Sequence, residues 1–149
     1  MAYPRKIAHH RTIHRFGGDS VPCVLLVYPN IWSEVFPLSI LTLSAVLKLD
    51  DFEVDVFSAE HQRRANNPQG NVALEGVDPD AFRAFRQRIE DFQSQVIGFS
   101  VVEHAFPLAL RLLDHITNPG IRGILGGVFP AFAAEIAARH ARVSTAGYR

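Results

Sequence analysis

The sequence predicts an α/β fold built on a parallel sheet. Short runs of aliphatic and β-branched residues recur along the chain without polar alternation, as in strands buried on both faces. Longer segments with apolar residues at helical spacing lie between these runs. Strands that alternate with helices in this way form parallel sheets with right-handed crossovers. We therefore expect a single flavodoxin-like (Rossmann-like) domain of about five parallel strands with helices on both faces.

The first predicted elements are a strand, a helix and a second strand. Residues 24–28 (VLLVY) form a buried run that turn residues end. Pro37 then begins a helix over residues 38–49, and residues 53–58 form the second strand. In this helix Leu38, Leu41, Ala45 and Leu49 repeat at helical spacing. Ile40, Leu43, Val46 and Leu47 widen its apolar face.

The rest of the chain repeats the pattern after a polar segment, residues 61–76, which predicts a long surface loop. Asp78 and Pro79 are a strong helix start, because Asp caps a helix and Pro suits its first position. The further expected elements are strand 96–102, helix 107–117, strand 121–125 and helix 130–140, and residues 142–146 could form a short fifth strand.

Composition excludes several classes of protein. The 149 residues carry 15 Lys and Arg against 15 Asp and Glu, so no nucleic-acid partner is expected. No apolar run is long enough to span a membrane, and no membrane partner is expected. The single cysteine, Cys23, excludes an internal disulfide, a multi-cysteine zinc site and a cluster held by several of this chain's cysteines, and it fits a cytoplasmic location. Residues 1–21 are expected to be a flexible basic leader before the domain at 22–149.

A ligand site is expected at the carboxyl ends of the strands, where parallel sheets bind their ligands. Three helix starts there carry an aromatic residue before proline: Phe36-Pro37, Phe106-Pro107 and Phe129-Pro130. Trp32 adds another large ring. These rings either pack against the first turns of their own helices or form an apolar floor for a large flat ligand.

The common nucleotide and hydrolase motifs are missing from the sequence. It contains no GxGxxG after the first strand, no GxxxxGK[ST] and no nucleophile elbow. Gly126-Gly127 directly follows a buried run, and it allows either a ligand or a neighbouring backbone to approach closely. By itself the pair is equally expected of a tight strand-to-helix turn.

Several segments together resemble the cobalamin-binding domain at the N-terminus of many radical S-adenosylmethionine (SAM) enzymes. Their order and spacing, from residue 24 to residue 147, carry the resemblance more than any one of them does. The segments are VLLVYPN (24–30), PLSILTLSAVL (37–47), EVDVFSA (53–59), VIGFS (96–100) and ILGGVFP (124–130).

The resemblance implies that the corrin ring lies over the carboxyl ends of the strands and that its nucleotide tail passes between sheet and helices. By matching position, Ser100 and Gly126-Gly127 would hold the tail, and Tyr28, Pro29, Asn30 and Trp32 would lie beneath the corrin. The expected cofactor-binding set is completed by Phe36, Val101, Glu103, His104, Val128 and Phe129. His104 either reaches the axial face or donates to a corrin side chain, or it is a surface residue near a helix start.

Two departures from the family limit what this chain can do. The stretch 30–34 lacks the His of the Asp-x-His-x-x-Gly motif that the methionine synthase and mutase form of this domain carries, an absence that radical SAM members often share. Cobalamin is therefore expected to have no protein His ligand, and the resemblance implies that it binds base-off. The CxxxCxxC motif is also absent, so the chain is not expected to be an enzyme on its own, and its expected partner is a radical SAM domain or subunit in trans. The alternative is a degenerate α/β protein-interaction module that binds no cofactor and uses the same aromatic edge against a partner.

Overall fold

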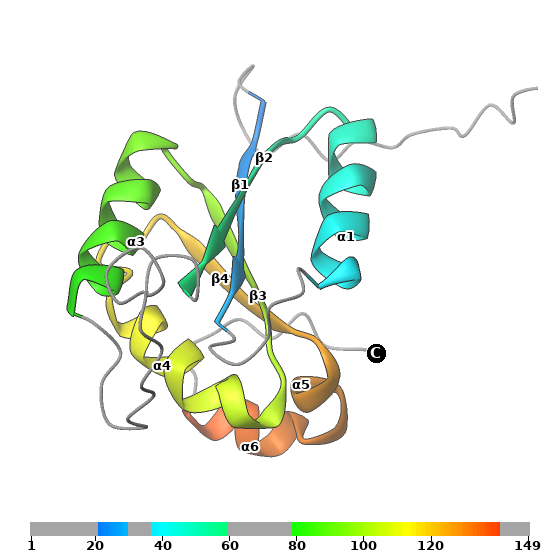
Figure 1. The fold of residues 1–149 in the computed structure, drawn as a ribbon, viewed down its shortest axis with the longest axis vertical. Helices are drawn as coiled ribbons and strands as arrows, with labels where there is room; N and C mark the ends of the chain where they lie inside the picture. Colours follow the sequence, from blue (N-terminus) through cyan, green and yellow to red (C-terminus); the bar gives the residue numbers. More distant parts are fainter. Residues whose placement is uncertain (1–20, 30–36, 60–78, 141–149) are drawn as a thin grey trace, which may run out of the picture.

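The computed structural model describes residues 21–29, 37–59 and 79–140, and these form an α/β domain with a parallel sheet. The strands are β1 (Cys23–Tyr28), β2 (Glu53–Ser58), β3 (Val96–Ser100) and β4 (Arg122–Gly126), in the order β2-β1-β3-β4 (Figure 1). The predicted fold class is therefore confirmed, with four strands in the described part of the chain instead of about five. The possible fifth strand, 142–146, lies outside the described residues.

Helices lie on both faces of the sheet, as expected. α1 (Leu38–Leu49) covers one face, and α3 (Pro79–Asp91) and α4 (Phe106–Asp114) cover the other (Figure 1). A 3-10 turn, η1 (Glu103–Ala105), precedes α4. The single helix predicted over 130–140 is instead two, α5 (Val128–Phe132) and α6 (Ala134–His140), because Ala133 leaves helical geometry at φ −124°, ψ 44°.

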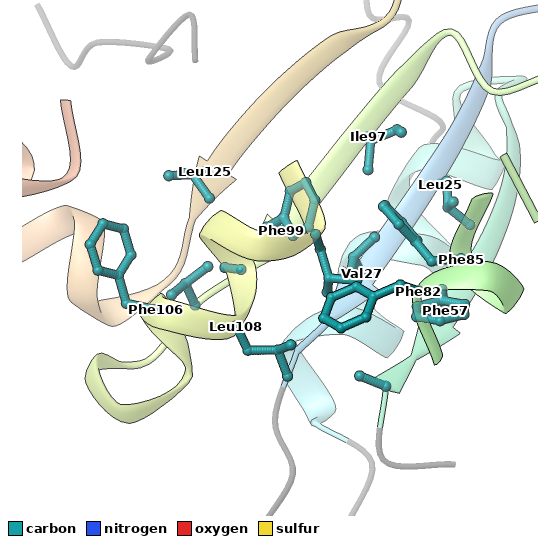
Figure 2. Packing of buried hydrophobic residues seen from close by; sticks show 14 of the residues in the cluster. Leu25, Val27, Phe57, Phe82, Phe85, Ile97, Phe99, Phe106, Leu108 and Leu125 are labelled. Atoms are coloured by element: carbon teal, nitrogen blue, oxygen red, sulfur yellow. The ribbon is translucent and has the colours of Figure 1, made fainter. Parts of the chain in front are cut away.

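The larger core lies between the sheet and the helices α3 and α4 (Figure 2). Phe85 of α3 is fully buried, and its ring centroid lies 5.2 Å from that of Phe57 and 6.2 Å from that of Phe99. An ion pair of 3.1 Å joins Arg88 of α3 to Asp55 of β2. These contacts hold α3 across β2, β1 and β3.

The α1 face has a smaller core, and the helix contacts it through only part of the wide apolar face that the sequence indicates. Ile40 and Ser44 are buried and Leu47 is partly buried. Leu38 and Leu49 are exposed, by 77% and 74%. Because α1 is apolar around most of its circumference, spacing alone does not select the buried side.

Two helices end with a non-glycine residue in the left-handed region. Gln93 follows α3 with φ 51°, and the N–H of Ser94 then donates to the carbonyl of Ile89 at 3.1 Å. Asp51 follows α1 in the same way with φ 62°. This is the Schellman arrangement, which satisfies the last carbonyls of each helix and turns the chain into the next strand.

Candidate functional site

The carboxyl ends of β1, β3 and β4 bring several predicted site residues to one edge of the sheet. Ser100 ends β3 directly opposite Gly126, which ends β4. Tyr28 ends β1 one residue after Val27, which pairs with Phe99 of β3. Tyr28 and Ser100 are half-buried, and Pro29 is fully buried. The structure therefore places these residues at the edge where the sequence predicted a site.

Two hydrogen bonds join the backbone of Val101 to the end of β4 and the segment that follows it. Its N–H donates to the carbonyl of Gly126 at 2.8 Å, and its carbonyl accepts from the N–H of Phe129 at 3.1 Å. Its side chain is fully buried in the larger core. Val101 thus joins the end of β3 to the start of α5, and its polar backbone atoms already have partners.

Gly127 passes so close to Val101 that no side chain fits. Its φ is 99° and its ψ is −173°, a region that glycine alone occupies readily. A Cβ atom on Gly127 would lie 2.7 Å from both the nitrogen and the oxygen of Val101. Of the two alternatives for this glycine, the structure favours approach by a neighbouring backbone.

Gly126 has more space at its Cβ position than Gly127 has. A Cβ atom added there would meet a single heavy atom within 4 Å, the carbonyl oxygen of Phe99 at 3.7 Å, which is ordinary contact. Phe99 and Leu125 point into the larger core. Because side chains alternate along a strand, the next residues, Ser100 and Gly126, lie on the opposite face of the sheet. This is the face that α1 covers over β1 and β2. Gly98 shares this face, where an added Cβ would lie 3.2 Å from Cδ2 of Leu26.

Two of the three predicted aromatic–proline pairs have a packing role. Phe106 is buried, and its ring centroid lies 4.7 Å from that of Phe129, with an interplanar angle of 43°. Both rings pack against the larger core, on the side of the sheet opposite to Gly126. The interpretation as helix-start packing therefore describes Phe106 and Phe129 better than an apolar floor for a ligand does.

The remaining predicted site residues are exposed or outside the described residues. Glu103 and His104 lie on η1 and are exposed, and Val128 at the start of α5 is 62% exposed. Asn30, Trp32 and Phe36 fall in a segment outside the described residues. Within the described ranges, no group of three or more His, Cys, Asp and Glu side chains could hold a metal ion.

A cavity of about 590 Å³ lies at the opposite, amino-terminal edge of the sheet, and the sequence did not predict it. The carboxyl ends of α3 and α4 form its walls, with Arg86, Glu90, Ser94, His115 and Asn118 among the lining residues. The hydroxyl oxygen of Ser94 is buried and makes no hydrogen bond. Because these residues come from two helix ends and a turn that are distant in sequence, no local motif indicates the cavity.

His115 lies at the rim of this cavity, at the carboxyl end of α4. Its position at a helix end favours the charged imidazolium, since a cation is stabilised near the carboxyl end of a helix. Burial and the nearby Arg86 and Arg111 guanidiniums instead lower the pKa of His115, although Asp114 raises it. Nη1 of Arg86 lies 3.1 Å from Nδ1 of His115, and because arginine only donates, this contact requires an unprotonated Nδ1.

Cys23 lies at the same amino-terminal edge, opposite Glu53. Its thiol donates to Oε2 of Glu53 at 3.6 Å, and burial together with this carboxylate raises the pKa of the thiol. A raised pKa lowers the fraction of reactive thiolate. The acidic neighbour of Cys23 is adjacent to it only in the folded sheet.

The parallel sheet with helices on both faces defines a Rossmann-like α/β domain. None of its described helices has the length and apolar content needed to cross a membrane. Comparison with solved structures finds similarity to the radical S-adenosylmethionine methyltransferase TsrM from Kitasatospora setae, solved with a tryptophan substrate and a SAM analogue bound. The TM-score is 0.53 at 17% identity, and the match covers 70% of this chain but 19% of the methyltransferase chain. At this identity the similarity shows the fold alone.

Comparison with protein-family models finds no match, and the search of curated proteins finds none either.

Proposed function

We propose that this chain is a cobalamin-binding module related to the N-terminal domain of cobalamin-dependent radical SAM enzymes. The observation that carries the proposal is the small-residue face formed by Gly98, Ser100 and Gly126 at the carboxyl edge of β3 and β4. Gly126 leaves room for an atom at its Cβ position, which is what close approach of a ligand to the backbone requires. The fold similarity to a radical SAM enzyme supports the same assignment.

The proposal gives the glycine pair two separate roles. Gly126 and Ser100 would contact the nucleotide tail, and the Ser100 hydroxyl would supply a hydrogen bond. Gly127 would act indirectly, because it holds the start of α5 against Val101. Tyr28 and Pro29, together with Asn30, Trp32 and Phe36 from the sequence prediction, would lie beneath the corrin.

The remaining predicted cofactor-binding residues would contribute to the site in different ways. Glu103, His104 and Val128 are exposed at this edge and could contact the corrin periphery through their side chains. Val101 and Phe129 would support the site through packing. When bound, the cofactor would supply a reactive cobalt centre, and residues 30–34 contain no histidine that could ligate it.

The test is cofactor binding by the full chain. The purified protein is mixed with hydroxocobalamin and desalted, and the absorption spectrum of the protein fraction is recorded. We expect corrinoid to co-elute with a base-off spectrum. Protein that is folded by circular dichroism and carries no corrinoid would refute the proposal.

A matched pair of variants locates the site. Gly126→Val fills the approach to the sheet and should abolish retention of corrinoid while leaving the protein folded. Gly120→Val places the same side chain at an exposed turn before β4, at the other edge of the sheet, and should retain the cofactor. Equal retention by both variants would contradict a tail bound over Gly126.

A second candidate function, a protein-interaction module without cofactor, is favoured by a different observation. Val128 and Phe132 of α5 and Ile136 of α6 are all exposed, Phe132 by 89%. An exposed apolar patch of this kind often marks a protein interface. The partner we propose is a radical SAM subunit or domain with a CxxxCxxC motif, acting in trans.

This candidate is tested by co-expression with a protein encoded next to this chain that carries CxxxCxxC. Phe132→Glu should weaken the association, and Thr117→Glu, an exposed position at the other edge of the sheet, should not. Association that is unchanged by Phe132→Glu would exclude this patch as the interface.

A further inference from the structure

The cavity at the amino-terminal edge of the sheet has the size of a small-ligand site. Its volume of about 590 Å³ lies within the range of pockets that hold small organic molecules, about 300–1,000 Å³. It lies at the edge opposite to the proposed corrin site. Arg86, Ile89 and Glu90 line it from one face of α3, since residues three and four apart are neighbours on a helix. The α3 wall of the cavity therefore combines an apolar side chain with two opposite charges.

Ser94, which also lines the cavity, carries a buried hydroxyl group that lacks a partner. The residue is 5% exposed, and its hydroxyl oxygen makes no hydrogen bond within the described part of the chain. Its backbone N–H already donates to the carbonyl of Ile89 at 3.1 Å, so the unmet hydrogen bond belongs to the side chain. Buried polar groups in native proteins nearly always have a partner, because burial without one costs free energy. A ligand in the cavity can supply this partner.

The backbone of the cavity wall has little left to offer a ligand. The N–H groups of Gln93, His115 and Ile116 each donate to a carbonyl three residues earlier, at 3.0–3.1 Å. The N–H of Gly120 donates to Oδ1 of Asn118 at 2.9 Å. Recognition of a ligand therefore falls to the side chains.

At one end of the cavity the available groups are hydrogen-bond donors. Nη1 of Arg86 lies 3.1 Å from Nδ1 of His115, and this bond uses one of the five N–H groups of the guanidinium. Because Nδ1 accepts, the neutral imidazole carries its proton on Nε2, which is a further donor. The His115 ring packs on Phe82, with ring centroids 4.7 Å apart, and the guanidinium carbon of Arg111 lies 4.8 Å from the Phe82 centroid. Donors beside two guanidinium groups favour a carboxylate.

Toward the carboxyl end of α3 the available groups favour a cation. Glu90 lies one turn beyond Arg86 on the same face of the helix, and the carboxyl end of a helix stabilises positive charge. The hydroxyl of Ser94, just past this helix end, can accept a hydrogen bond. Side chains one turn apart start about 5–6 Å from each other at Cβ. Arg86 and Glu90 are therefore close enough to meet a carboxylate and an ammonium group carried by one small molecule.

The apolar part of the cavity is formed by isoleucines. Ile89 comes from α3, and Ile116 and Ile121 come from the segment between α4 and β4. Ile89 is buried, and the other two are half-buried. Since Ile89 lies on the same face of α3 as the two charged residues, a ligand that meets both charges also has an apolar surface beside it.

We propose that this cavity binds a free α-amino acid with an apolar side chain. Its carboxylate meets Arg86 and His115. Its ammonium group meets Glu90 and the Ser94 hydroxyl, and its side chain meets the isoleucines. A zwitterion fits better than an ion of either sign because the cavity offers a partner for each charge. The proposal does not depend on cofactor binding, because the cavity lies at the other edge of the sheet from Gly126.

The first test is titration of the full chain with L-phenylalanine, L-leucine and L-methionine, followed through the NMR signals of the His115 ring. At least one of the three should shift these signals to saturation. Each amino acid that binds is then compared with the acid that lacks its amino group and the amine that lacks its carboxyl group. Both analogues should bind at least about 10-fold more weakly, because each leaves one charged partner unmet.

Matched variants locate the amino acid. Arg86→Gln and Glu90→Gln each remove one charge at an exposed position and should weaken binding at least about 10-fold. Arg139→Gln and Glu135→Gln make the same changes at exposed positions of α6 and should bind as wild type does. Gly126→Val, which fills the proposed corrin site, should also leave amino-acid binding unchanged. The two proposals can therefore fail separately.

Ser94→Ala separates a binding role from a structural one. Removal of an unpaired buried hydroxyl should leave the unliganded chain at least as stable as wild type in urea denaturation. The same variant should bind the amino acid about 5-fold more weakly, since it loses one hydrogen bond to the ligand. A loss of stability without ligand, at unchanged affinity, would show that Ser94 has a partner within the protein.

Three results would overturn the proposal. One is that none of the three amino acids binds. The second is an analogue with a single charge that binds as tightly as its amino acid, which would make the cavity a site for a simple anion or cation. The third is binding that is unchanged in Arg86→Gln or Glu90→Gln, or equally lost in the α6 controls, which would place the amino acid elsewhere.

Discussion

Replacing each glycine of the Gly126-Gly127 pair by alanine tests the division of roles between them. At Gly127 the backbone, φ 99° and ψ −173°, is costly for any residue with a Cβ, by about 1–3 kcal/mol. The added methyl group also meets the Val101 nitrogen and oxygen at 2.7 Å. Both atoms are hydrogen-bonded and cannot simply move away, so forced displacement adds about 1–3 kcal/mol. Gly127→Ala should therefore lose about 2–6 kcal/mol of unfolding free energy.

Gly126→Ala should behave differently at the adjacent position. Its Cβ comes no closer than 3.7 Å to the Phe99 carbonyl oxygen, and alanine restricts the unfolded chain more than glycine does. We expect unchanged stability or a gain of up to about 1 kcal/mol. The assay is urea denaturation followed by circular dichroism, comparing midpoints at constant slope. Equal stability of the two variants, or a Gly127→Ala protein as stable as wild type, would refute this account of the turn.

Three further predictions concern the core and the amino-terminal edge. Phe85→Ala removes a fully buried ring and should cost about 3–5 kcal/mol in denaturation, and a loss below about 1 kcal/mol would contradict its central place in the core. Glu53→Gln removes a carboxylate that raises the pKa of Cys23, so the pKa should fall and alkylation near pH 8 should be faster; an unchanged rate would count against the contact. The lowered pKa of His115 means that the unfolded chain takes up a proton first as pH falls through about 6.5, so stability should decline there in wild type. His115→Gln should reduce that decline in denaturation measured at pH 7.5 and 5, and an equal decline would show that other groups cause it.

The elements that sequence predicted best are those with strong local signals. Pro37 precedes a helix that runs over Leu38–Leu49, and the strand at Glu53–Ser58 has the predicted bounds. Prediction was poorer where a contact from a distant segment decides the geometry. α5 begins at Val128, ahead of Pro130, where the N–H of Phe129 donates to the carbonyl of Val101 in another loop.

The sequence could not select the buried side of α1 for a different reason. Periodicity identifies a buried side only when the opposite side is polar, and this helix offers apolar residues in most directions. The buried side is the one that meets Val24 and Leu26 of β1, and it includes Ser44, a polar residue that no hydrophobic stripe would include.

The candidate site was predictable as a location and not as a set of contacts. Parallel strands bring their carboxyl ends to one edge, so residues after β1, β3 and β4 had to meet there. The sequence could not reveal which residues face which side at the end of each strand. It grouped Ser100 with Val101 and Gly126 with Gly127, and in each pair one residue faces the proposed ligand while the other holds the fold.

This separation gives the cofactor proposal a sharper test than binding alone. A variant that destabilises the turn, such as Gly127→Ala, should lose corrinoid only to the extent that it unfolds, because that residue faces Val101. A variant that fills the open face, such as Gly126→Val, should lose corrinoid while still folded. Adding a low concentration of urea should therefore make wild type resemble the first variant and never the second. If loss of corrinoid followed loss of folded protein in both variants, the small-residue face would have no role in recognition beyond its place in the sheet.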